Sequence, residues 1–103
     1  MNNITIKKLS AMPYAQAHVE ITADGEVNLF SYETLVVSID RDGWVQVSGL
    51  YSMTTRKHIS AFAKEYCKPL DYHTLKKVYN DDMVINMHTG EVVDFNTYVN
   101  GNE

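Results

Sequence analysis

The stretch Leu35 to Val47, LVVSIDRDGWVQV, decides the fold because it encodes two strands and the turn between them. β-branched and other apolar residues fill Leu35 to Ile39, and a second apolar run extends from Trp44 to Val47. Between them lies Asp40-Arg41-Asp42-Gly43, whose glycine supplies the positive φ of a tight hairpin turn. The consecutive apolar residues Leu35 to Val37 predict a central strand that is covered on both faces. The stretch therefore predicts a hairpin within an antiparallel sheet.

Further strands are predicted on the N-terminal side of this hairpin. Apolar residues alternate with polar ones from Val19 to Ile21 and from Val27 to Leu29, on either side of Asp24-Gly25. Asp-Gly is a strong signal of a tight turn, so these runs predict another hairpin. The alternation from Ile4 to Lys7 predicts a short opening strand.

After Gly49 the apolar period changes from that of a strand to that of a helix. Four apolar residues lie at i, i+3, i+4 and i+7 on one helical face: Ile59, Phe62, Ala63 and Tyr66. They predict a helix over about residues 54–67, which Pro69 ends. Asp71 is a typical N-cap, and it predicts a second, shorter helix over about residues 71–80.

The remaining apolar residues predict a closing hairpin over about residues 83–95, around His88-Thr89-Gly90. The length of 103 residues suits one domain, spanning residues 1–103. The expected fold class is therefore α+β, in which a small antiparallel sheet built from hairpins carries two short helices packed on one face.

Charge is unevenly distributed along the chain. The net charge is −4, but Thr54 to Tyr79 contains six cations against two carboxylates, and the rest contains three cations against eleven carboxylates. Such polarity predicts either a basic face directed at an anionic partner or pairing of the basic and acidic halves within a dimer, and solvated surface charge is the competing interpretation. The basic face consists of Arg56, Lys57, Lys64, Lys76 and Lys77.

The stretch Tyr51 to Ile59, YSMTTRKHI, gathers hydroxyls, cations and a histidine at the start of the first predicted helix. Ser52, Thr54 and Thr55 form a candidate anion site, because free backbone N–H groups at a helix start attract anions. Ordinary helix capping is the competing interpretation. His58 lies beside the apolar stripe, where a histidine typically packs and hydrogen-bonds a neighbouring strand. A catalytic His58 is the alternative.

Neither a leader nor a spanning segment is evident, so we expect a cytoplasmic protein without membrane contact. The lone cysteine, Cys67, has no partner for an intramolecular disulfide. The four histidines are scattered without metal-ligand spacing, so no cofactor or metal is expected.

The segment Phe30 to Phe62 resembles a domain of small, uncharacterised proteins of phages and mobile elements. In that domain a Ser-Tyr strand and an Asp-Gly hairpin lead into Y-S-x-T-T-x-x-H-I-x-x-F. The matching residues, which span about a third of the chain, are Ser31, Tyr32, Val36, Asp42, Gly43, Val45, Val47, Tyr51, Ser52, Thr54, Thr55, His58, Ile59 and Phe62. The resemblance implies a phage-like origin and a compact α+β fold, and it transfers no catalytic role.

These features bear on three functional classes: a protein-interaction module, a nucleic-acid-binding protein and an enzyme. Seven tyrosines, five methionines and a tryptophan favour an interaction module, because such residues are enriched at interfaces. We therefore predict a small non-catalytic protein that binds a host protein. Its exposed strand edges also suit a homodimer. The most specific form of this prediction is an inhibitor of a host defence protein. The alternative is a nucleic-acid-binding regulator that uses the basic face, with Tyr66, Tyr72 and Tyr79 stacking on bases. An enzyme is not expected.

Overall fold

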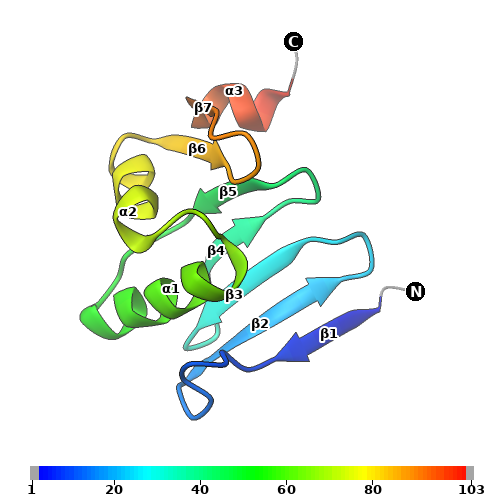
Figure 1. Ribbon diagram of the computed structural model, residues 1–103, viewed down its shortest axis with the longest axis vertical. Helices are drawn as coiled ribbons and strands as arrows, with labels where there is room; N and C mark the ends of the chain where they lie inside the picture. Colours follow the sequence, from blue (N-terminus) through cyan, green and yellow to red (C-terminus); the bar gives the residue numbers. More distant parts are fainter. Residues whose placement is uncertain (1–2, 102–103) are drawn as a thin grey trace.

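Seven strands form one antiparallel sheet in which the spatial order of the strands follows their order in the chain (Figure 1). The computed structural model describes residues 3–101. The strands are β1 (Ile4–Lys7), β2 (Ala17–Thr22), β3 (Val27–Ser31), β4 (Thr34–Ile39), β5 (Trp44–Val47), β6 (Met83–Asn86) and β7 (Val92–Asp94). The predicted α+β class with an antiparallel sheet is confirmed.

Two helices, α1 (Met53–Tyr66) and α2 (Tyr72–Asn80), connect β5 to β6 and lie together on one face of the sheet (Figure 1). Their ends differ from the predicted ranges of 54–67 and 71–80 by at most one residue. Asp71 is the N-cap of α2, as expected: its side chain accepts a hydrogen bond from Thr74 N at 3.0 Å.

The core lies between these helices and the sheet. Phe62 and Ile59 on α1 and Leu75 on α2 are fully buried against inward-facing strand residues. The strand residues that are fully buried in this cluster are Val19, Leu29, Val36, Val37 and Val45. The helical stripe predicted from the 3.6-residue period therefore faces the sheet, although Tyr66 at its end is only partly buried.

β4 is central, as predicted, but it is not covered on both faces. Leu29 pairs with Val37 and Phe30 pairs with Leu35, so Val36 is an extra residue in a β-bulge. The bulge explains how the consecutive residues Val36 and Val37 are both buried in the one core. Leu35 lies on the opposite face and is 37% exposed. The prediction that β4 is covered on both faces was wrong, because the consecutive apolar residues arise from the bulge and not from burial of both faces.

A third helix, α3 (Phe95–Asn100), was not predicted from the sequence, which placed residue 95 in the closing hairpin. Asp94 caps α3 by accepting hydrogen bonds from the backbone N–H groups of residues 96 and 97. Tyr98 donates a hydrogen bond from its hydroxyl to Asp40 Oδ2 at 2.8 Å, and its ring lies 6.1 Å from that of Trp44. Because Val45 faces the core, its neighbour Trp44 faces the other side, and α3 therefore packs on the sheet face opposite α1 and α2.

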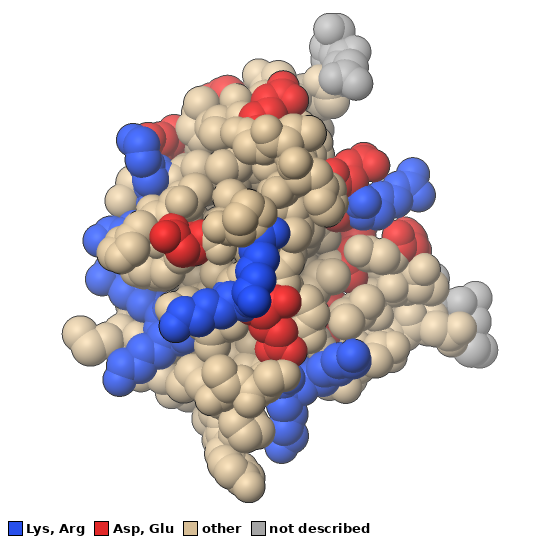
Figure 2. All heavy atoms as spheres, viewed as in Figure 1, with Lys and Arg blue, Asp and Glu red and all other residues tan. Residues whose placement is uncertain are grey.

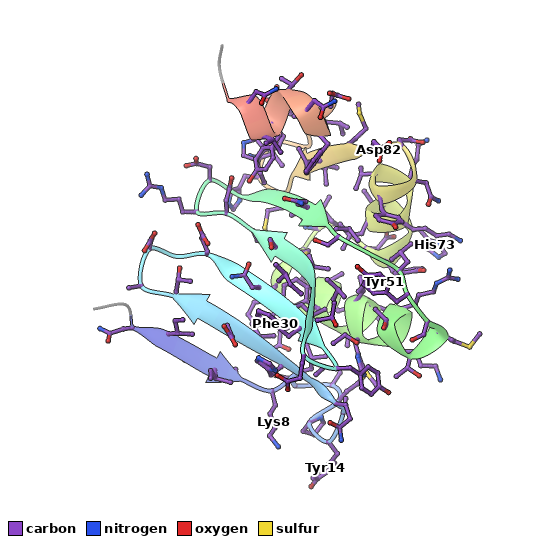
Figure 3. All side chains as sticks on the ribbon, turned by 180° about the vertical axis from the view of Figure 1, so that it is seen from behind. Lys8, Tyr14, Phe30, Tyr51, His73 and Asp82 are labelled. Carbon is purple, nitrogen blue, oxygen red and sulfur yellow. The ribbon has the colours of Figure 1, made fainter. Side chains whose placement is uncertain are left out.

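Among residues 3–101, no other helix lies on this second face. Phe30 lies there and its ring stacks on that of His18 at 5.0 Å (Figure 3). His18 also contacts Glu20, with 2.9 Å between Nε2 and Oε2. Within residues 3–101, none of the three helices is both long and apolar enough to cross a membrane.

Candidate functional site

The start of α1 is fixed by Ser52. This residue has extended backbone angles, and its Oγ accepts a hydrogen bond from Thr55 N at 3.1 Å, as an N-cap does. The Ser52 hydroxyl also donates to Thr55 Oγ1 at 3.2 Å. Of the three predicted capping hydroxyls, Ser52 is therefore the one that caps the helix.

Thr55 and His58 point from α1 into the sheet, where they meet Ser31 at the end of β3. The Ser31 hydroxyl lies 3.2 Å from Thr55 Oγ1 and 2.9 Å from His58 Nδ1. All three side chains are at most 3% exposed. This buried network ties α1 to β3, in agreement with the expectation that His58 hydrogen-bonds a neighbouring strand.

The imidazole of His58 is shielded from water. Its ring lies 5.8 Å from that of Tyr32, and burial lowers the pKa of its imidazole below the ordinary value of 6.5. Desolvation disfavours the charged imidazolium, so His58 is neutral at pH 7. One ring nitrogen of a neutral imidazole accepts a hydrogen bond and the other donates one, and the Ser31 hydroxyl satisfies either role at Nδ1.

Capping and the buried network account for two of the three hydroxyls in the candidate anion site. Ser52 and Thr55 bond to each other and to the helix start, and Thr55 is 3% exposed. Thr54 is exposed, and because it is next to Thr55 in the helix, the two side chains lie on different faces. The structure thus separates the three hydroxyls, and anion binding at this helix start stays a prediction.

The residues of the predicted basic face are all exposed. Figure 2 shows Lys and Arg side chains over the region of α1 and α2, with single carboxylates between them. Lys77 Nζ lies 3.1 Å from Asp81 Oδ2, in a pair whose partners are both well exposed and which is therefore weak. In the described part of the chain, no carboxylate lies within 4.0 Å of the cationic groups of Arg56, Lys57, Lys64 or Lys76.

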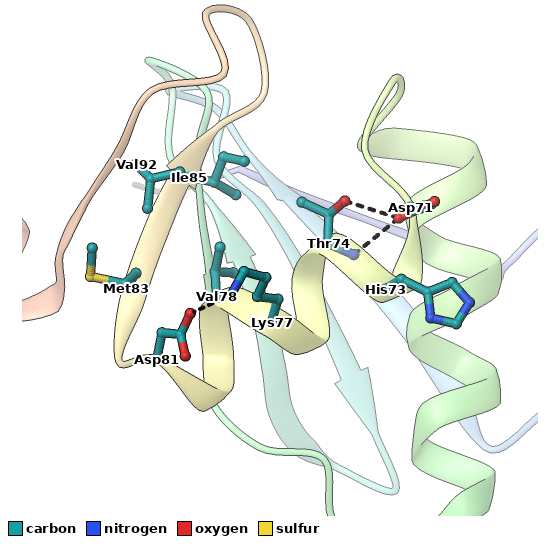
Figure 4. Close-up of a pocket in the computed structure, with 9 residues that line it drawn as sticks. All are labelled: Asp71, His73, Thr74, Lys77, Val78, Asp81, Met83, Ile85 and Val92. Carbon is teal, nitrogen blue, oxygen red and sulfur yellow. Dashed lines mark hydrogen bonds and ion pairs between the residues drawn. The ribbon is translucent and has the colours of Figure 1, made fainter.

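An open groove lies beside the basic face, between α2 and the last two strands (Figure 4). Its volume is about 600 Å³. The apolar wall consists of Val78 on α2 and Met83, Ile85 and Val92 on the strands. Val92 is 43% exposed, which is unusual for a valine on the helix-covered face of a sheet.

The rim of this groove is polar and partly paired. Asp71 accepts hydrogen bonds at 3.0 Å from both the backbone N and the hydroxyl of Thr74, and these bonds lower the pKa of its carboxyl. Lys77, which belongs to the basic face, also lines the groove. The two features therefore meet at Lys77, whose ammonium group is paired with Asp81, another residue of the groove lining.

The sequence did not indicate the groove. Its walls come from α2 and from strands that follow it, and only β6 and β7 in their observed register bring Ile85 and Val92 together. Ser31 was also missed as the partner of His58.

Two further groups bear on chemistry. Cys67 is fully buried, and burial raises the pKa of its thiol to about 12, so it is not a reactive nucleophile. Among the residues that the structure describes, no three His, Cys, Asp or Glu side chains cluster closely enough to hold a metal ion.

The chain was compared with protein families, curated proteins and solved structures. A model for a family of unknown function, DUF8033, matches residues 2–84, a range that contains the stretch Phe30 to Phe62 and extends from β1 into β6. β7 and α3 lie beyond the matched range, and so does Val92 of the groove. No curated protein and no solved structure matches the chain.

Proposed function

We propose that this chain, which belongs to the DUF8033 family of unknown function, works by binding a protein partner through the surface formed by the basic face and the groove. The observation that carries the proposal is that the apolar groove adjoins the exposed cations of the basic face, which it meets at Lys77. A protein interface typically combines an apolar centre with a polar or charged rim, and this surface has both.

The chemistry of the partner follows from the surface. The groove suits one or two apolar side chains, such as leucine or phenylalanine, against Val78, Ile85 and Val92. Asp71 and Asp81 line the groove together with Lys77, so the attraction for carboxylates comes from the cations of the adjoining basic face, which attract them before contact and orient them after it. We therefore expect an acidic protein segment that carries an apolar anchor.

A non-catalytic role is supported by the burial of the serine and histidine that could have acted as nucleophile and base. Ser31 and His58 are in contact, but both are buried and bonded within the α1–β3 junction. A nucleophile and its base need access to substrate, and burial denies it to this pair. Their hydrogen bonds instead satisfy groups whose burial would otherwise be costly.

The sharpest form of the proposal is inhibition of a host defence protein. It rests on the resemblance of Phe30 to Phe62 to phage-encoded proteins, because small phage proteins commonly act by binding a host protein. A cytoplasmic location is part of this proposal, since the target would be met inside the host cell.

The alternative, a nucleic-acid-binding regulator, draws on the same cations. The tyrosines expected to stack on bases are less available than the sequence suggested. Tyr66 packs on Phe62 with 5.1 Å between ring centroids, and Tyr72 and Tyr79 are partly buried against the core. A mobility-shift assay with single- and double-stranded DNA at low salt tests this alternative, and a complex that weakens steeply with salt would favour it.

The test of the proposal is affinity capture from host lysate with two matched pairs of variants. Lys76→Glu reverses a charge on the basic face, and Arg41→Glu reverses one on the β4–β5 turn. Val92→Lys fills the groove, and Val99→Lys alters an exposed valine of α3 outside it. We expect one acidic protein to be captured by the wild type and by the Arg41 and Val99 variants, and lost with the other two.

The result that would contradict the proposal is the absence of any specific partner, or a partner that all four variants retain. Inhibition is then a separate question: the purified partner's activity should fall when the wild-type chain is added and remain unchanged with Lys76→Glu.

A further inference from the structure

The side chains of β1 alternate in the sense opposite to that expected for an edge strand. Lys7 pairs with Val19, a core residue, so Lys7 and Thr5 lie on the helix-covered side. Ile4 and Ile6 therefore point to the face opposite α1 and α2, where they are 49% and 66% exposed. An ordinary edge strand directs its isoleucines into the core.

β1 also has a free edge. It is the first strand in the sheet order, and within residues 3–101 it pairs only with β2. Figure 1 shows it at the margin of the molecule, away from α1 and α2. All four of its residues are exposed. The outward N–H and C=O groups of such a strand are a template for another strand.

We propose that two copies of this chain associate by antiparallel pairing of β1 with the partner's β1, which joins the two sheets into one. Antiparallel strands of identical sequence are related by a two-fold axis perpendicular to the sheet, so the interface is self-complementary. The proposal is independent of the protein partner discussed above, because it uses a different edge of the molecule.

The sequence of β1 selects the register. Directly opposed residues must point to the same face of the sheet. The two-fold axis therefore has to lie between one residue and the same residue of the partner, and not at the midpoint of two consecutive residues. An axis at Thr5 places Ile4 opposite the partner's Ile6, and Ile6 opposite the partner's Ile4. An axis at Ile6 would instead place Ile4 opposite the partner's Lys8. Only the Thr5 register pairs every isoleucine with an isoleucine.

Charge favours the same antiparallel arrangement. Lys7 and Lys8 are at the end of β1, whereas its start lies beside the acidic β2–β3 turn, where Asp24 and Glu26 line a small hollow together with Ile4. Antiparallel pairing brings the cationic end of one copy to the acidic turn of the other, at both ends of the interface. Parallel pairing would place like charges together.

The dimer has a functional consequence for the surface on α1 and α2. A two-fold axis perpendicular to the sheet leaves α1 and α2 of both copies on the same side. The joined sheet then presents two basic faces and two grooves in one direction, so that it can bind a partner that has two matching segments with increased avidity.

The first test is the solution mass of the whole chain by light scattering over a range of concentrations. We expect the average mass to rise with concentration from 11.7 kDa towards twice that value. Ile4→Lys/Ile6→Lys should keep the mass at 11.7 kDa, because it places cations opposite each other across the interface. The matched control Tyr14→Lys/Val99→Lys changes two exposed apolar residues elsewhere and should dimerise like the wild type.

The second test fixes the register by cysteine cross-linking. Opposed residues have Cα atoms about 4.5–5.5 Å apart, which suits a disulfide. Thr5→Cys should therefore give a covalent dimer under mild oxidation, whereas Ile4→Cys and Ile6→Cys should remain largely monomeric. The native Cys67 is buried and does not interfere. Circular dichroism of each variant verifies the fold.

A constant mass of 11.7 kDa for the wild type up to about 1 mM would overturn the dimer. Lys7 would then act as a charge that protects the edge from pairing. Cross-linking of Ile6→Cys in preference to Thr5→Cys would overturn the register.

Discussion

Two sets of polar side chains lie within one turn of each other on α1 and have opposite roles. Thr55 and His58 point inwards and hydrogen-bond Ser31, whereas Arg56 and Lys57 point outwards and have no carboxylate within 4.0 Å in the described part of the chain. The difference arises from helical spacing: residues three apart share a face, and those between them do not. It teaches that a cluster in sequence can separate in space into a structural part and an exposed part.

The largest effect is expected from removal of the buried imidazole. His58→Ala leaves a cavity and deprives the Ser31 hydroxyl of a partner, so the free energy of unfolding should fall by about 2–5 kcal/mol. Urea denaturation measures it. Arg56→Ala, two residues away but exposed, should change the same quantity by at most about 0.5 kcal/mol. Equal effects at the two positions would show that burial does not separate them.

A smaller loss is expected at the other end of the same hydrogen bond. Ser31→Ala removes the hydroxyl that contacts both Thr55 and His58, which should cost about 1–3 kcal/mol of unfolding free energy. The double variant with His58→Ala should lose less than the sum of the two single losses, because the residues share one network. Strict additivity would argue against the network.

The hydrogen bond from Tyr98 to Asp40, which anchors α3, is partly buried, so its burial lies between that of His58 and that of Arg56. Burial, with a further contribution from Asp40, raises the pKa of Tyr98 to about 12, so its hydroxyl remains a donor at neutral pH. Tyr98→Phe should lower the free energy of unfolding by about 0.5–1.5 kcal/mol in the same urea assay. No loss would mean that α3 is held by its apolar contacts alone.

The pH dependence of stability should report the burial of His58. Its folded pKa is lowered, so the unfolded chain binds more protons below the unfolded value near 6.5. Stability is therefore complete above that pH and falls as the pH drops through it. Urea denaturation at about pH 7.5 and about pH 5.5 should show a smaller pH-dependent loss for His58→Gln than for the wild type. The same loss in both would assign it to other groups.

Much of the fold could be predicted from the sequence because its apolar periods are clear. Asp24-Gly25 and Asp42-Gly43 mark two turns, and the stripe from Ile59 to Tyr66 defines α1. The turn between β3 and β4 was harder, since Tyr32 and Glu33 adopt positive φ without being glycine or asparagine. α3 is only six residues long and begins directly after β7, so it offers too little periodicity to detect.

The candidate site was predictable only in part. The cations of the basic face are exposed because they fall away from the apolar stripe, which the helical period already indicates. Ser31 and His58 are 27 residues apart, and their contact depends on how α1 crosses β3. The groove depends on the register of β6 and β7 and on the width of α2, which no local pattern encodes.

The most direct test of the central claim measures partner capture and unfolding free energy in parallel for two variants. Arg56→Glu/Lys76→Glu should lose the captured acidic protein while its free energy of unfolding changes by at most about 0.5 kcal/mol. Ser31→Ala should keep the captured protein while losing stability. The central claim is that the exposed cations of α1 and α2 bind the partner, whereas the buried Ser31, Thr55 and His58 stabilise the fold. Capture that survives the charge reversal, but disappears with Ser31→Ala under conditions in which that variant is still folded, would contradict this claim.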